Sequence, residues 1–119
     1  MRNVVTVLAG VLAAEFLTFG AAKLLAVPAM RERAGHLGFS TAFYRGIGVL
    51  EIAGGSGALI GLARPRVGAA AGIGLGSLMT GAGLAHRRNH DDVAALAPAV
   101  GTGLLVGAYL VALGARCSS

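Results

Sequence analysis

Two glutamates, Glu15 and Glu51, interrupt long apolar stretches of this 119-residue chain. Glu15 lies within VVTVLAGVLAAEFLTFGAAKLLAV, and Glu51 lies within FYRGIGVLEIAGGSGALIGLA. A charged side chain at the centre of a bilayer costs at least about 2.5 kcal/mol, so such residues usually face a protein interior or a wet cavity. A neutral carboxyl group can donate a proton and an ionised one can accept a proton. The two glutamates are therefore the candidate catalytic residues.

Four further side chains are candidates for contact with a substrate: Lys23, Tyr44, Arg45 and His86. Each is expected toward one membrane face, above the glutamates. Lys23 follows Glu15 by eight residues, which places Glu15 about 12 Å deeper at 1.5 Å per residue. Together these groups would line a polar funnel between the helices. Two structural alternatives stay open: Lys23 extends to the interface, or Glu51 forms a buried ion pair with Lys23 or Arg45.

The composition predicts a membrane protein that would position these residues on helices. Of the residues, 55% are hydrophobic and 13% are charged, whereas a soluble domain carries about a quarter charged residues. A spanning helix needs about 20 apolar residues, and four stretches fit: residues 3–27, 43–63, 66–85 and 93–115. We expect one all-α domain over residues 1–119, an integral membrane four-helix bundle with antiparallel, up-down-up-down helices.

The polar connections support this division of the chain. The longest, PAMRERAGHLGFST, is able to form a short amphipathic helix in the interface. Ser40 or Thr41 is a candidate cap for the next helix, and Asp91 and Asp92 are candidate caps for the last one. Arginines are divided almost evenly between the two ends of the predicted helices, so the orientation in the membrane stays open. The first stretch is long and contains Glu15, which favours a retained helix over a cleaved signal peptide.

Glycine is abundant, with 20 residues, and several glycines recur at four-residue spacing. Small residues let membrane helices approach closely. The spacing predicts helix–helix seams at three sets of glycines: Gly57 and Gly61; Gly68, Gly72 and Gly76; Gly103 and Gly107. The run GIGLGSLMTGAG lacks the GxGxxG spacing of a dinucleotide loop and has no preceding strand.

Several functions are disfavoured by the sequence. The net charge of +5 comes mainly from arginines that flank helices rather than form a stripe, so we expect no nucleic-acid partner. Cys117 is the single cysteine, which excludes an internal disulfide and a dithiol pair. His86 and His90 are four residues apart, but no third ligand with suitable spacing completes a metal site. We therefore predict no metal and no evident cofactor, although a bound quinone is possible.

The motif residues of the chain resemble the DoxX-like family of small bacterial membrane proteins. The resemblance is carried by GAAKLLAVP, HLGF, YRGIGVLEIAGGSGALIGL and LMTGAGLAHRR, which together cover most of the chain. It implies a four-helix bundle in the bacterial plasma membrane, and the founding members of the family are associated with quinone-linked sulfur oxidation. Lys23, Glu51 and His86 are the residues that it carries over. Glu15 departs from the family pattern, where an apolar residue is expected.

Three functions follow from these observations. In the first, the protein binds a hydrophobic small molecule such as a quinone in the bilayer, beside an oxidoreductase partner. In the second, Glu15 and Glu51 make it an acid–base enzyme, an isomerase, epoxide hydrolase or cyclase, that acts on a lipophilic substrate. In the third, it is a scaffold or a small transporter, and transport by so few helices would require a homodimer. Substrate identity and oligomeric state stay open at this point, as does any role of Cys117.

Overall fold

The computed structural model describes residues 2–118, and every regular element in that range is an α-helix, as predicted. Residues 2–118 form five helices, one more than the four expected. They are α1 (Arg2–Leu24), α2 (Pro28–Leu37), α3 (Thr41–Ile60), α4 (Pro65–Arg88) and α5 (Val93–Ser118). The additional helix, α2, forms within the polar segment that was expected to hold a short amphipathic piece. The long helices end up to three residues from the predicted boundaries.

Three of the helices, α1, α4 and α5, are long and apolar enough to cross a membrane. Helix α3 has 20 residues, about 30 Å at 1.5 Å per residue, but it carries Arg45 and Glu51. That α3 also crosses the bilayer stays a prediction. The apolar composition of the three helices makes the protein a multi-pass membrane protein.

Local signals in the sequence explain where the helices begin and end. Pro28 occupies the first turn of α2, where its missing N–H is not needed. Helix α2 ends at Gly38, whose φ of 79° lies in the left-handed region that glycine adopts without strain. The Ser40 hydroxyl accepts a hydrogen bond from the backbone N–H of Phe43 and caps α3. Asp92 caps α5 in the same way, accepting from the N–H of Ala95 at 3.0 Å.

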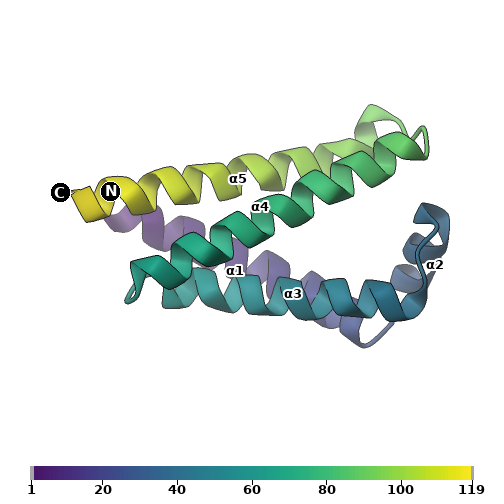
Figure 1. Ribbon diagram of the computed structural model, residues 1–119, viewed down its shortest axis with the longest axis horizontal. Helices are drawn as coiled ribbons and strands as arrows, with labels where there is room; N and C mark the ends of the chain where they lie inside the picture. The colour runs from purple at the N-terminus through teal and green to yellow at the C-terminus, as the bar shows by residue number, and fades with distance from the viewer. Residues whose placement is uncertain (1, 119) are drawn as a thin grey trace.

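The long helices form two pairs, α1 with α3 and α4 with α5 (Figure 1). Helices α1 and α3 touch where Gly20 faces Gly48: a Cβ atom built on Gly48 would lie 2.6 Å from the Gly20 carbonyl oxygen. Such a distance leaves no room for a side chain. In Figure 1 the two pairs lie close together near the chain termini and diverge toward the end that carries α2.

The predicted glycine seams occur at most of the expected positions. Gly61 and Gly68 face each other beside the α3–α4 turn, where a Cβ atom on Gly68 would lie 2.8 Å from the Gly61 Cα atom. A Cβ atom on Gly72 would meet Leu110 of α5. Gly107 is an exception, because it has open space around it. The expectation of a seam at Gly107 was therefore wrong, since this residue lies on an exposed face of α5.

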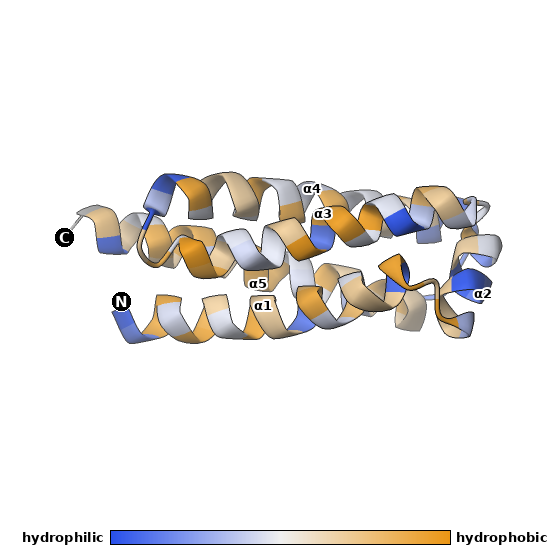
Figure 2. Cartoon of the chain, turned by 90° about the horizontal axis from the view of Figure 1, so that it is seen from below, coloured by the Kyte–Doolittle hydropathy of each residue, from blue (hydrophilic) through white to orange (hydrophobic). Residues whose placement is uncertain are grey.

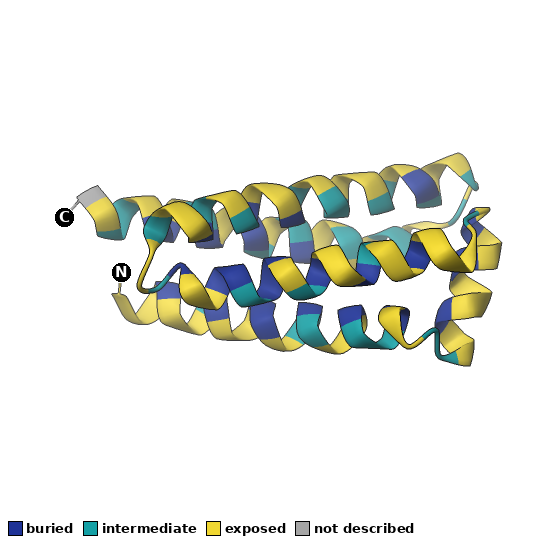
Figure 3. Ribbon diagram, turned by 60° about the horizontal axis from the view of Figure 1, so that its bottom comes forward, coloured by how far each residue is buried: buried dark blue, intermediate teal, exposed yellow. Residues whose placement is uncertain are grey.

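Two apolar clusters hold the helices together. The larger one lies toward the chain termini and contains large buried side chains of three helices, among them Leu12, Phe16, Leu75 and Tyr109. The smaller one joins Met30, Ala34 and Leu37 of α2 to Tyr44 and Ala85. The outer faces of the long helices are exposed and largely hydrophobic, as comparison of Figures 2 and 3 shows. Such faces are suited to contact with lipid rather than water.

Candidate functional site

A cavity of about 1320 Å³ lies between the α1–α3 pair and the α4–α5 pair. It occupies the region where the two pairs diverge, and residues of all five helices line it. Most of the walls are apolar or small, with Phe19, Leu50 and Leu78 among the larger contributors. Five of the six residues selected from the sequence line this cavity: Glu15, Lys23, Tyr44, Glu51 and His86.

Lys23 and Glu51 form an ion pair across the α1–α3 contact. The Lys23 Nζ atom lies 2.8 Å from the Glu51 Oε1 atom, and the two side chains are only 10% and 4% exposed. The ammonium group also lies over the rings of Phe19 and Tyr44, 5.8 and 5.3 Å from their centroids. One of the three N–H groups of Lys23 is used by Glu51, which leaves two that can reach a bound molecule.

Glu15 lies deeper in the cavity than this pair. Its carboxylate accepts a hydrogen bond from the Thr102 hydroxyl of α5. It is also close enough to Glu51 for the two carboxylates to repel each other. Glu15 has no oppositely charged residue three or four positions away on its own helix, and Thr102, which is 87 residues away, was not identified from the sequence. Only the fold brings α1 and α5 together at this level.

Tyr44 and Arg33 stand at the α2 end of the cavity. Tyr44 is buried, and its hydroxyl interacts with the guanidinium group of Arg33, which is on α2. Arg33 also attracts Glu51 electrostatically. Arg33 was not selected from the sequence, because nothing in the polar loop indicated that a helix there would turn one arginine toward the cavity.

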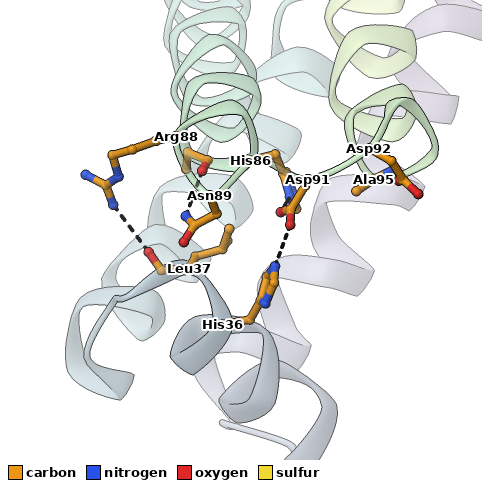
Figure 4. A network of polar contacts seen from close by, with 9 residues as sticks. His36, Leu37, His86, Arg88, Asn89, Asp91, Asp92 and Ala95 are labelled. Carbon is orange, nitrogen blue, oxygen red and sulfur yellow. Dashed lines mark hydrogen bonds and ion pairs between the residues drawn. The ribbon is translucent and has the colours of Figure 1, made fainter.

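His86 is held by a network of polar contacts at the same end (Figure 4). The Asp91 carboxylate accepts hydrogen bonds from His86 Nδ1 at 2.7 Å and from His36 Nε2 at 2.8 Å. The hydrogen bond from His86, and to a smaller extent that from His36, holds the pKa of Asp91 below its usual value. Asp91 was a candidate cap of α5, but its carboxylate binds the two histidines instead.

Arg45 is the one selected residue that the structure does not bring into the cavity. Its Nε atom donates a hydrogen bond to the carbonyl oxygen of Leu24 at 2.9 Å, and its side chain is exposed. Of the two ion pairs considered for Glu51, the structure has the one with Lys23 and not the one with Arg45. Arg45 instead satisfies a carbonyl group at the end of α1.

The cavity thus offers two polar regions separated by apolar walls. The deeper one is Glu15 with Thr102, and the outer one is the Lys23–Glu51 pair with Tyr44 and Arg33. Along α1 the positions of Glu15 and Lys23 are about 12 Å apart, from their eight-residue spacing, whereas Glu51 of the outer region is close enough to Glu15 to interact with it electrostatically. In residues 2–118, no group of three or more His, Cys, Asp and Glu side chains is arranged to hold a metal ion.

Comparison with known proteins gives one match. The model of the DoxX-like family matches residues 7–112, which include all the cavity-lining residues discussed above. No curated protein and no solved structure matches the chain.

Proposed function

The chain belongs to the DoxX-like family of membrane proteins, and from this premise we propose that its cavity binds a hydrophobic small molecule of the quinone type within the bacterial plasma membrane. The observation that carries the proposal is a buried Lys23–Glu51 ion pair exposed to a large apolar cavity. Ligand sites typically combine apolar walls with a few convergent polar groups. This cavity has that composition.

The geometry suits a ligand with a carbonyl oxygen. Lys23 has two N–H groups left after its bond to Glu51, and the Tyr44 hydroxyl lines the same cavity. The quinone oxygen would accept from Lys23, while its ring would lie near Phe19. The residue types of this chain do not themselves carry electrons, so the quinone would exchange them with an oxidoreductase partner.

The test is binding of decylubiquinone to the purified protein in lipid nanodiscs. The variant to compare is Lys23→Met with Glu51→Leu, which removes both ions while keeping apolar volume. Hydrogen bonds to charged groups contribute about 1.5–3 kcal/mol, so the affinity should fall about tenfold or more. Arg87→Met, at an exposed residue outside the cavity, is the matched control. Equal affinity in wild type and the double variant would refute the proposal.

A second candidate function is acid–base catalysis on a lipophilic substrate, and a specific observation favours it. Glu15 and Glu51 both line the cavity, and they differ in surroundings: Glu51 pairs with an ammonium group, whereas Glu15 has only a hydroxyl donor. Two carboxyl groups in different surroundings are the arrangement that acid–base catalysis uses. In epoxide opening, Glu51 would take a proton from the attacking water as Glu15 protonates the epoxide oxygen.

This second function predicts that Glu15→Gln and Glu51→Gln each abolish hydrolysis of a long-chain epoxide in nanodiscs. The two variants should retain the helical circular dichroism spectrum of the wild type. Product formed at the wild-type rate by both variants would eliminate the enzymatic reading. If the wild type turns over no epoxide and the two Gln variants lose quinone binding, the first function is favoured.

A further inference from the structure

The end of the cavity that faces water is closed by α2. The helix packs across it, with Met30, Ala34 and Leu37 buried against Tyr44 of α3 and Ala85 of α4. On the α4 side the closure is also polar. We use the term clasp for the three residues His36, Asp91 and His86, whose two hydrogen bonds tie α2 to the α4–α5 connection (Figure 4).

A second polar contact reinforces the closure. The Arg88 Nη2 atom donates to the carbonyl oxygen of Leu37 at 3.3 Å, and its guanidinium carbon lies 5.9 Å from the centroid of the Phe39 ring. Arg88 therefore joins the end of α4 to the end of α2. A water-soluble molecule approaching from this face would have to displace both these contacts and the clasp.

The side of the cavity between α3 and α4 is different. Its rims are formed by residues that line the cavity and are also exposed, including Phe43 and Leu50 on α3, 54% and 57% exposed, and Val67 on α4, 41% exposed. Gly74 and Gly81, on the same rim of α4, have no atom within 4 Å of a built Cβ. This side is thus apolar and unobstructed where it faces the acyl chains.

The polar groups are distributed unevenly within the cavity. Lys23 and Tyr44 lie with Arg33 of α2 at the closed end, and Glu15 and Thr102 lie deeper, on α1 and α5. The α3–α4 rims carry glycine, alanine and apolar residues together with Ser77, whose hydroxyl donates to the carbonyl oxygen of Ile73. A molecule with a polar head would place that head under α2. Its apolar part would then extend along the cleft between α3 and α4 toward lipid.

We infer that the cavity is loaded sideways from the bilayer, through the cleft between α3 and α4, and that its ligand is an amphiphile with one polar head and one narrow apolar chain. The inference rests on the proposed function and adds to it the shape of the ligand and the route of access. The apolar chain of the ligand lies beside glycine and alanine residues, whose small size leaves space for it, while the clasp keeps the aqueous end closed.

The first experiment compares decylubiquinone with the same quinone lacking a chain, each added to wild-type protein in nanodiscs. Each pair of methylene groups removed from water is worth roughly tenfold in affinity, so the chain-bearing quinone should bind at least about tenfold more tightly when both affinities are corrected to the free aqueous concentration of the quinone. Equal corrected affinities would overturn the inference while leaving the proposed function intact. Absence of saturable binding of either quinone would refute the proposed function and the inference with it.

The second experiment tests the route. Gly74→Leu and Gly81→Leu add side chains at the cleft where no steric conflict opposes them, and they should slow association of decylubiquinone by about tenfold or more. Gly107→Leu is the matched control, because it also lies in open space but outside the cavity lining, and it should associate at the wild-type rate. His36→Ala opens the clasp and should leave the association rate unchanged.

Two results would contradict the lateral route. Wild-type association rates in both cleft variants would show that the ligand does not pass between α3 and α4, and faster loading of His36→Ala would assign access to the aqueous end. A stable dimer in native mass spectra that Gly74→Leu and Gly81→Leu abolish would instead assign the cleft to a second copy of the chain and overturn the inference.

Discussion

Replacement of the Lys23–Glu51 pair is the most informative perturbation of the fold, because each single variant should be strongly destabilised whereas the double variant should be nearly as stable as wild type. At 2.8 Å and an effective dielectric constant of about 20, the attraction between the two charges is about 6 kcal/mol. Removing two ions from water costs several kcal/mol each, so the pair contributes little net stability. Removal of one partner leaves the other ion buried, which costs about 3–5 kcal/mol.

We therefore expect Lys23→Met and Glu51→Leu each to lower the free energy of unfolding by about 3–5 kcal/mol, and the double variant to stay within about 1 kcal/mol of wild type. The assay is SDS-induced unfolding in mixed micelles, followed by circular dichroism because the chain contains no tryptophan. The double-mutant cycle gives the coupling between the two side chains. Additive losses in the double variant would refute a buried pair at this position.

Three further predictions concern packing, pH and a buried hydroxyl. Gly48→Ala should lower the free energy of unfolding by about 1–3 kcal/mol in the same assay, because its Cβ atom would collide with backbone of α1, whereas Gly10→Ala, with open space around it, should be neutral or stabilising; equal effects would contradict the close approach. Because the pKa of Asp91 is lowered in the fold, its contribution to holding α2 should be complete above the unfolded-state value of about 3.9 and be lost as the pH falls through the lower folded-state value. The protection of α2 amides from hydrogen exchange, measured against the intrinsic exchange rate at the same pH, should therefore fall only in that acidic range in wild type. Asp91→Asn should remove this transition, and the same transition in both proteins would contradict the role of Asp91. Tyr109→Phe, which removes a 2.9 Å bond to a carbonyl oxygen of α3, should cost about 1 kcal/mol of unfolding free energy, and no loss would argue against that bond.

The helices could be predicted from the sequence because their signals are local. Long apolar runs, Ser40 and Asp92 each act within a few residues, and Ser40 and Asp92 cap the helices that they were expected to cap. The extra helix α2 is also local in origin. Its position over the cavity is not, since that depends on contacts with Tyr44 and Ala85, which come from other parts of the chain.

Part of the site could be predicted because depth in a membrane helix follows from residue counting. The error with Arg45 arose from using depth without direction. Arg45 precedes Glu51 by six residues, which places the two about 120° apart around α3, whereas Tyr44 precedes it by seven and lies on nearly the same face. The helical angle alone therefore separates Tyr44, which lines the cavity, from Arg45, which binds the carbonyl oxygen of Leu24.

Two of the contacts that the sequence did not reveal join residues that are distant along the chain. Thr102 bonds to Glu15 across 87 residues, and Asp91 bonds to His36 across 55. Neither pair has a spacing that helical periodicity can detect. A histidine or aspartate in a polar connection gives no sign of such a contact. The clasp therefore could not be predicted from the sequence, and it becomes visible only once α2 is packed against the end of α4.

The most direct test of the central claim is photolabelling with an azido-substituted quinone in nanodiscs, followed by mass spectrometric mapping of the modified residues. A quinone held beside the Lys23–Glu51 pair should label residues that line the cavity, such as Phe19, Tyr44 and Leu50, and excess decylubiquinone should suppress that label. Label confined to lipid-facing residues such as Val7 and Val111, which are 63% and 70% exposed, and insensitive to competitor, would contradict the account.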